Sequence, residues 1–293
     1  MKIRILGTAA GGGTPQWNCA CAQCTRARRE GTARTQDCLA VSANGTDWYL
    51  VNASPDIRVQ ILAAPELTPG PGQRDTPVRG VLLTDAELDH TLGLVALREG
   101  ADLDVYGSAP MFSALDEGFP VQRILAPYGS TRWHETADGV PFTLAGGLRV
   151  TAIALSAKRP RYAAERPAHD DWVVAYRFAD PLPGAALLYA PCLAQWTSAF
   201  DAALEGVSHL LVDGSFFHQD EMARTAGWSA SASDMGHLPI SESLEAVAGH
   251  PGLRCLYTHL NNTNPVLDTR TAEYRAVRAA GADVAADGQL LEL

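Results

Sequence analysis

The sequence has no long apolar run and little positive charge. No stretch of its 293 residues approaches the roughly 18 uninterrupted apolar residues that a membrane span requires. The first apolar stretch reaches glycine at Gly7, too early for the apolar part of a signal peptide. The 23 basic and 33 acidic side chains give a net charge of −10, which disfavours binding to nucleic acid or to an anionic membrane. We therefore expect a cytoplasmic protein that binds a small molecule or a peptide.

Internal repeats and low-complexity tracts are also absent from the sequence. Apolar residues make up 46% of the chain and charged residues 19%, a globular composition that excludes a disordered or fibrous protein. The segments 66–74 and 157–171 contain prolines, and the first also glycines, that interrupt helices and strands. We interpret both segments as long surface loops rather than as linkers between domains. The length fits one or two domains, and we favour a single domain over residues 1–293 built from two similar halves.

Short strand-like segments and helix-like segments occur in both halves of the chain. The strand-like segments are rich in aliphatic and β-branched residues. They lie at 2–6, 39–42, 48–52, 78–83, 104–106, 149–155, 172–178, 186–189, 209–212 and 255–258. Helices are expected at 55–63, 92–98, 109–116, 194–205, 241–247 and 271–280. Thr269 is the expected cap of the last helix. Strands predominate first in each half and helices cover them, which predicts a layered α/β/β/α architecture.

Three of the six cysteines lie within six residues, at Cys19, Cys21 and Cys24. In a cytosolic chain such closely spaced thiols are better explained as metal ligands than as disulfide partners. Zinc prefers four tetrahedral ligands, so a structural zinc site over residues 17–38 needs a fourth ligand from elsewhere; the alternative is a reduced loop without metal. The other cysteines are scattered and are given no metal role: Cys38, Cys192 and Cys255.

A polar cluster follows the apolar residues Val81-Leu82-Leu83, which end the predicted strand at 78–83. Asp85, Glu87, Asp89 and His90 lie within six positions, and each side chain can bind a metal or a proton. Asp89 has the alternative role of capping the next helix, and His90 that of a buried structural histidine. The glycine-rich loop 11–13 is free to approach a ligand closely.

This cluster resembles the metallo-β-lactamase superfamily signature, His-x-His-x-Asp-His followed by Gly-Leu. Asp89 and His90 match the signature, whereas Asp85 and Glu87 stand in place of its first two histidines. The segment that ends at His259 resembles the superfamily's last metal-binding strand. The resemblance implies an αββα sandwich in which His259 joins Asp89 and His90 as a metal ligand.

Two departures from the superfamily pattern change the expected metal centre. Ser156-Ala157 replaces a third histidine, and Pro191 stands where an aspartate would bridge two metal ions. What remains is two histidines and one carboxylate. This is the ligand set of mononuclear non-haem iron(II) oxygenases, which leave positions open for oxygen and substrate.

Further motifs resemble the pyrroloquinoline quinone biosynthesis protein B family. They lie at 7–24, 33–36, 52–58, 97–100, 212–214, 235–238 and 259–265. This resemblance implies an iron(II)- and oxygen-dependent hydroxylase, an oxidoreductase that acts on the tyrosine ring of a Glu-Tyr-derived precursor of that quinone or of a related peptide-derived cofactor. In related phosphodiesterases a histidine completes the cysteine zinc site; Asn262 stands at that position, so the fourth zinc ligand stays open, with Asn262 as a candidate.

Four residues are expected to take part in catalysis: Asp85, Glu87, Asp213 and His237. Asp85 and Glu87 alternate with Asp89, so an extended backbone would point all three carboxylates toward the metal, where one could accept a phenol proton. They can instead be groups that orient the ligands, or solvated turn residues. His237 can be an acid or base or a structural residue, and Asp213 can be a loop anchor.

Two other functions remain open at this stage. One is a metal-dependent hydrolase of an ester or phosphodiester, and the other is a noncatalytic carrier of the quinone product. The expected partners are a small peptide or amino-acid-derived substrate and O2, without nucleic acid or membrane. The sequence does not predict an oligomeric state.

Overall fold

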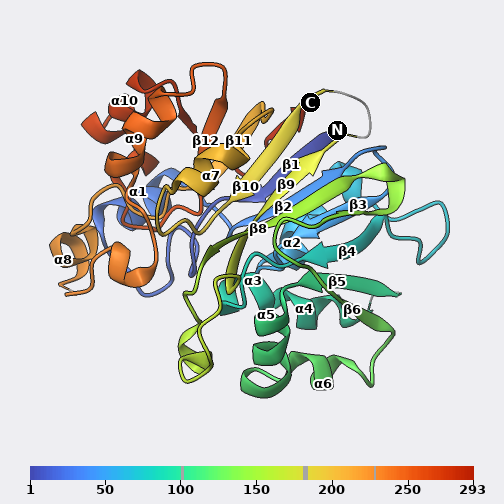
Figure 1. The fold of residues 1–293 in the computed structure, drawn as a ribbon. Coiled ribbons are helices and arrows are strands. Elements are labelled where there is room, and N and C mark those ends of the chain that lie inside the picture. The colour runs from blue at the N-terminus through green and yellow to red at the C-terminus, as the bar shows by residue number, and fades with distance from the viewer. Residues whose placement is uncertain (100–101, 181–183, 228) are drawn as a thin grey trace.

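The structure, a computed structural model, describes residues 1–99, 102–180, 184–227 and 229–293. Within these ranges two seven-stranded sheets lie face to face, and helices cover their outer faces (Figure 1). The predicted α/β/β/α layering is confirmed. The expectation of one domain made of two similar halves stays a prediction.

The first sheet joins both ends of the chain. Its strand order is β14 (Leu290–Glu292), β1 (Lys2–Gly7), β2 (Cys38–Ser42), β3 (Trp48–Val51), β4 (Val78–Leu82), β5 (Leu103–Gly107) and β6 (Thr131–Glu135). Strands β3 to β6 run parallel, whereas β1 pairs antiparallel with β2 and β14. The carboxyl ends of β3 to β6 therefore lie along one edge of this sheet.

The second sheet repeats this mixture of parallel and antiparallel pairs. Its order is β13 (Asp283–Val284), β12 (Arg254–Thr258), β11 (His209–Asp213), β10 (Ala186–Ala190), β9 (Val173–Ala179), β8 (Arg149–Ser156) and β7 (Pro141–Thr143). Strands β10 to β13 run parallel, and β7 to β10 pair antiparallel. Loops that leave β10, β11 and β12 at their carboxyl ends can thus converge on a common site.

The helices are short and lie outside the sheets. They are α1 (Ala22–Glu30), α2 (Ile57–Ala63), α3 (Leu88–Thr91), α4 (Gly93–Ala96), α5 (Ala109–Ser113), α6 (Val121–Leu125), α7 (Ser198–Ala203), α8 (Glu221–Ala226), α9 (Ile240–Ala248) and α10 (Ala272–Ala279). In Figure 1, α7, α9 and α10 lie beside the second sheet, while α4, α5 and α6 lie at the opposite end of the molecule. No helix of the described chain combines the length and the apolar character that crossing a membrane requires.

Alternating side chains of the central strands fill two apolar layers. Leu187 and Tyr189 of β10 belong to the core shared with the first sheet. Leu188 of β10 and Leu210 of β11 face the other way and pack with Phe200 of α7. Because successive strand residues point to opposite faces, a nearly continuous apolar sequence is what a strand covered on both faces requires.

All ten predicted strands are present, but local details differ from the sequence analysis. Thr271 caps α10 by accepting a hydrogen bond from the Tyr274 amide, so the assignment of this cap to Thr269 was wrong. The helix predicted over 194–205 is shorter in the structure. It begins at Ser198, because the Thr197 side chain caps it by accepting a hydrogen bond from the Phe200 amide. Helix α1, inside the expected zinc loop, was missed. The edge strands β6, β7, β13 and β14 were missed as well, since they are short and partly polar.

Candidate metal centre

The site lies where loops from both sheets meet. Asp85 and His90 follow β4 of the first sheet, and His259 follows β12 of the second. His259 has a φ of 55°, a left-handed conformation that costs a non-glycine residue about 1–2 kcal/mol. Backbone hydrogen bonds on its C-terminal side hold this turn, from Leu260 to Thr8 and from Asn261 to Ser215. Such strain is characteristic of functional sites.

One side of the site is a buried pair between Asp85 and His90. The Nδ1 atom of His90 lies 2.8 Å from Oδ2 and 2.9 Å from Oδ1 of Asp85. Within the described residues, the Nε2 atom of His90 is buried and has no hydrogen-bond partner. The ring is therefore held at one nitrogen, and the other nitrogen is left for a ligand.

His259 is held in the same way from the second sheet. Its Nδ1 lies 2.7 Å from the hydroxyl of Ser215, and its Nε2 lies 3.5 Å from Oδ2 of Asp89. This Nε2 also lacks a hydrogen-bond partner in the part of the chain that the structure describes. The rings of His90 and His259 are 5.2 Å apart, with an angle of 66° between their planes.

These residues fit a metal ion. Leaving a buried polar atom unsatisfied costs about 1–3 kcal/mol, so two such nitrogens in one place call for a common partner. Metal-binding histidines normally use their second nitrogen for a hydrogen bond, as His90 does with Asp85 and His259 with Ser215. With Asp89 beside them, the donor set is two imidazole nitrogens and one carboxylate.

Negative charge surrounds the two rings. Burial lowers the pKa of His90, but the carboxylates of Asp85 and Asp89 outweigh it and raise the pKa to about 10. Burial raises the pKa of Asp89, whereas the nearby histidines bring it well below its usual value. The arrangement therefore favours a positive charge between these side chains, either a proton or a metal cation.

Cys192 lies at this centre, which the sequence analysis missed. Its sulfur and one ring nitrogen each of His90 and His259 all lie within 4.8 Å of one another. Cys192 directly follows Pro191, the position aligned with the bridging aspartate of the superfamily, and that neighbourhood was the available signal. Burial raises the pKa of its thiol well above the usual value.

A hydrogen-bond network supports His259 from behind. Asp213 accepts hydrogen bonds from the Ser215 hydroxyl at 2.7 Å and the Leu193 amide at 2.8 Å. The Nδ1 of His237 lies 2.7 Å from Asp213 and 3.0 Å from the Ser215 hydroxyl, and its ring stacks on that of His259. Asp213 thus anchors a loop and is joined to His259 through Ser215, a residue that the sequence analysis did not select.

The arrangement expected for the three alternating carboxylates is wrong. The chain does not stay extended, because α3 begins at Leu88 and carries Asp89 in its first turn. Asp85 turns inward to His90 and accepts a hydrogen bond from the Glu87 amide at 2.9 Å. The Glu87 side chain instead lines the neighbouring cavity, where burial and then the charges of Asp85 and Asp89 raise its pKa to about 7.

A cavity of about 650 Å³ opens beside Asp89. Gly11 and Gly12 form one of its sides, as expected of a loop able to approach a ligand. A Cβ atom on Gly11 would lie 3.1 Å from the Asp89 carboxylate, so glycine permits this close approach. The segment 157–171, predicted to be a surface loop, supplies another wall of the cavity through Lys158 and its neighbours.

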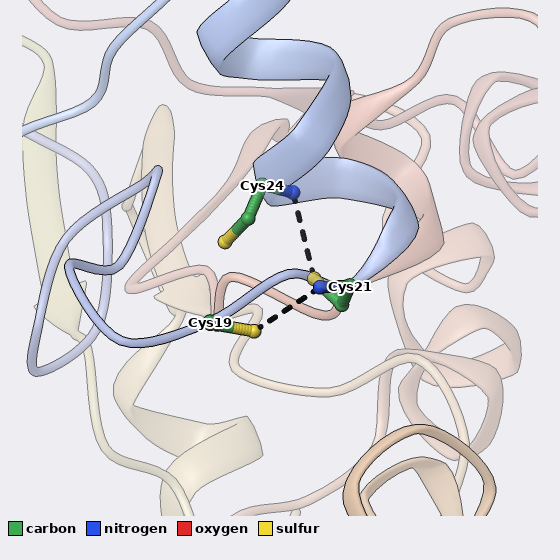
Figure 2. A group of neighbouring side chains, drawn as sticks. All are labelled: Cys19, Cys21 and Cys24. Carbon is green, nitrogen blue, oxygen red and sulfur yellow. Dashed lines mark hydrogen bonds between the residues drawn. The ribbon is translucent and has the colours of Figure 1, made fainter.

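The three clustered cysteines form a separate group (Figure 2). Their sulfur atoms lie within 4.8 Å of one another. Cys21 caps α1 by accepting a hydrogen bond from the Cys24 amide, and the Cys19 sulfur accepts one from the Cys21 amide. The side-chain amide nitrogen of Asn262 lies 3.2 Å from the Cys19 sulfur and 3.3 Å from that of Cys24. Asn262 therefore reaches the position of a fourth partner, three residues after His259.

Comparisons with known proteins agree with this architecture. Residues 47–260 match the model of the Beta-lactamase superfamily domain. The chain is 40% identical over 304 residues to Coenzyme PQQ synthesis protein B of Nitrosococcus oceani, covering 98% of each chain. It is 41% identical over 299 residues to the protein of the same name from Methylococcus capsulatus, again covering 98% of each. The crystal structure of Zn2+-bound PqqB from Methylobacterium extorquens aligns over 100% of both chains with a TM-score of 0.89 and 33% identity.

Proposed function

The chain belongs to the Coenzyme PQQ synthesis protein B family, and on that premise we propose that it is a metal-dependent enzyme of PQQ biosynthesis. We further propose the reaction: iron(II)- and oxygen-dependent hydroxylation of the tyrosine ring of a Glu-Tyr-derived precursor. The observation that carries this proposal is the pair of buried Nε2 atoms of His90 and His259 beside Asp89, which have no hydrogen-bond partner among the described residues. The metal-bound relative supports a metal in this fold.

Asp89, His90 and His259 are the residues that would hold the iron. Iron(II) supplies the electron transfer that O2 requires before it can react with an aromatic ring, which no protein side chain provides by itself. Asp85 and Ser215 fix the two imidazole rings through their second nitrogens. A donor set of Asp89, His90 and His259 would leave positions for O2 and substrate.

The remaining chemistry belongs to side chains of the cavity. Glu87 lines it and carries a carboxylate able to take the proton of a phenol. Tyr162, whose hydroxyl donates to the Ala86 carbonyl at 2.5 Å, lines the same cavity as Glu87. Hydroxylation inserts one oxygen atom of O2 into a ring C–H bond and reduces the other to water. The balance requires two electrons and two protons, so the reaction needs a small-molecule reductant.

The cysteine group has a different role in the proposal. Cys19, Cys21 and Cys24 would bind a structural zinc ion at the start of α1, with Asn262 beside them. A thiolate site adds its binding free energy to the stability of the fold. The loop from His259 to Asn262 connects this site to the iron site, so zinc would also stabilise the turn that presents His259.

Product analysis tests the proposed reaction. The protein is loaded with iron(II) without oxygen and then mixed with N-acetyl-Glu-Tyr, ascorbate and air-saturated buffer. We expect a product heavier by one oxygen atom on the tyrosine ring. Zinc-loaded protein should give none. His250→Ala, a change at a partly exposed histidine that pairs with Asp201, should give as much as the unaltered protein. Hydrolysis of a phosphodiester instead of ring oxidation would favour the hydrolase.

A further inference from the structure

We propose that Lys158, Arg159 and Arg161 form a carboxylate-binding wall of the cavity, which therefore accepts a substrate with at least two carboxylates. The inference deepens the proposed function, and rests on it only for the aromatic ring of the substrate. All three side chains line the cavity that also contains Asp89. They lie within four consecutive positions of the segment predicted to be a surface loop.

The positive charges of this wall are not neutralised by ion pairs within the part of the chain that the structure describes. Among the described residues, no carboxylate forms an ion pair with Lys158, Arg159 or Arg161. In contrast, Arg123 pairs with Asp116 at 2.9 Å on the surface. In a chain with a net charge of −10, three neighbouring cations without acidic partners are unusual, and they are available to an anionic ligand.

The wall is held in place by contacts on both sides. The Lys158 ammonium donates a hydrogen bond to the Asp234 carbonyl at 2.8 Å, and its stem packs so closely on Gly236 that a Cβ there would lie 3.0 Å away. The Arg159 guanidinium donates to the Arg166 carbonyl. Arg166 in turn donates to the Ser113 hydroxyl at 2.7 Å. Lys158 and Arg159 therefore need little ordering when a substrate binds, which favours affinity.

The rest of the cavity indicates how a substrate would lie. Its described lining contains two carboxylates, Glu87 and Asp89, against the three cations of the wall, so the balance is positive even without a metal. Leu88 and Leu92, both partly exposed, provide apolar surface next to Asp89. A phenol ring would thus pack on the leucines near Asp89, with the carboxylates directed to the wall. Arginine and carboxylate form strong charge-assisted hydrogen bonds.

Binding without turnover tests this inference. Iron-loaded protein is titrated anaerobically by calorimetry with N-acetyl-Glu-Tyr and with N-acetyl-Gln-Tyr-amide, which has the same shape and no carboxylate. We expect the acid to bind at least about tenfold more tightly than the amide. Arg161→Gln should weaken binding of the acid about tenfold and that of the amide by less than about twofold. The double variant R159Q/R161Q should lose more than either single change.

A matched control separates this effect from the loss of one positive charge elsewhere on the protein. Arg149 lies exposed at the far end of β8, and Arg149→Gln should leave both affinities unchanged. Equal binding of acid and amide to the unaltered protein would overturn the inference, as would a loss that is the same for both ligands in Arg161→Gln. Tighter binding of the acid without oxidation of the ring would support the carboxylate-binding wall and refute the proposed hydroxylation. Hydroxylation with unchanged affinities in the variants would refute the wall alone.

Discussion

The Nδ1 atom of His90 lies 2.8 Å from the carboxylate of Asp85, and both side chains are buried. The pair is formed across the turn that joins β4 to α3, so the local fold sets the ring orientation. Asp85 takes the place of a histidine in the superfamily signature. Asp85 therefore stands at the position of a metal ligand in that signature, but its carboxylate lies behind the His90 ring.

Asp85→Asn should weaken metal binding at the cavity without abolishing it. The amide can still accept a hydrogen bond from His90, but the negative charge is lost, and changes to such partners of metal ligands typically cost 10- to 100-fold in affinity. Competition with a chelator measures this. Asp104→Asn is the control, because Asp104 holds His134 at 2.7 Å on another strand. Unchanged affinity in Asp85→Asn, or an equal loss in the control, would contradict the role of Asp85.

His259→Ala should abolish iron binding at the cavity and spare zinc at the cysteine group. The variant removes one of three donors, whereas the cysteine sulfurs and Asn262 form a separate set. Elemental analysis of the purified protein gives both metal contents. Loss of both metals together would mean that the turn at His259 supports the zinc site as well. Retention of iron would show that His259 is not a ligand.

Cys21→Ser should lower zinc content and thermal stability. Cys21 both caps α1 and belongs to the group of three sulfurs, and removing one soft ligand weakens a site that contributes to folding. We expect the melting temperature to fall by roughly 5 °C or more. Cys255→Ala, at a buried thiol outside the group, should leave zinc content unchanged. An unaltered zinc content in Cys21→Ser would show that the cysteines do not form a metal site.

Glu87→Gln should retain iron and lose most of the turnover. Its carboxylate lines the cavity, whereas the carboxylates that contact His90 and His259 are those of Asp85 and Asp89. The substitution therefore removes a proton acceptor rather than a metal ligand. General bases contribute about 100-fold or more to rate. Exposed Glu245→Gln serves as the control in the same assay. Full activity between about pH 6 and pH 9 would rule out the base. Loss of the iron would instead make Glu87 a metal ligand.

The sequence predicted the strands well because their signal is local. Runs such as Ala186–Ala190 are apolar over their whole length, as expected of strands covered on both faces. The convergence of His259 with Asp89 was predicted only through the family resemblance, because residues so far apart in the chain meet through the topology of two sheets. The helical turn at Leu88–Thr91 was missed because four residues are too few to show the repeat of apolar residues that predicts a helix.

Ser215 and Cys192 were missed for a related reason, although Cys192 stands next to Pro191. Each lies in a loop whose sequence has no metal-binding spacing. Each reaches the site because β10, β11 and β12 are successive parallel strands, whose carboxyl ends lie at one edge of the sheet. The wall of Lys158, Arg159 and Arg161 was likewise interpreted as surface, because a loop folded over a cavity has the same polar composition as a loop in solvent. Such placements depend on tertiary packing.

The origin of the oxygen atom in the product tests the central claim most directly. Iron-loaded protein, ascorbate and N-acetyl-Glu-Tyr are incubated in two parallel reactions, one under 18O2 in ordinary water and one under ordinary O2 in H218O. The account predicts one 18O atom on the tyrosine ring in the first reaction and none in the second, with no product when iron is omitted. Label from water alone, or hydrolysis without consumption of O2, would contradict it.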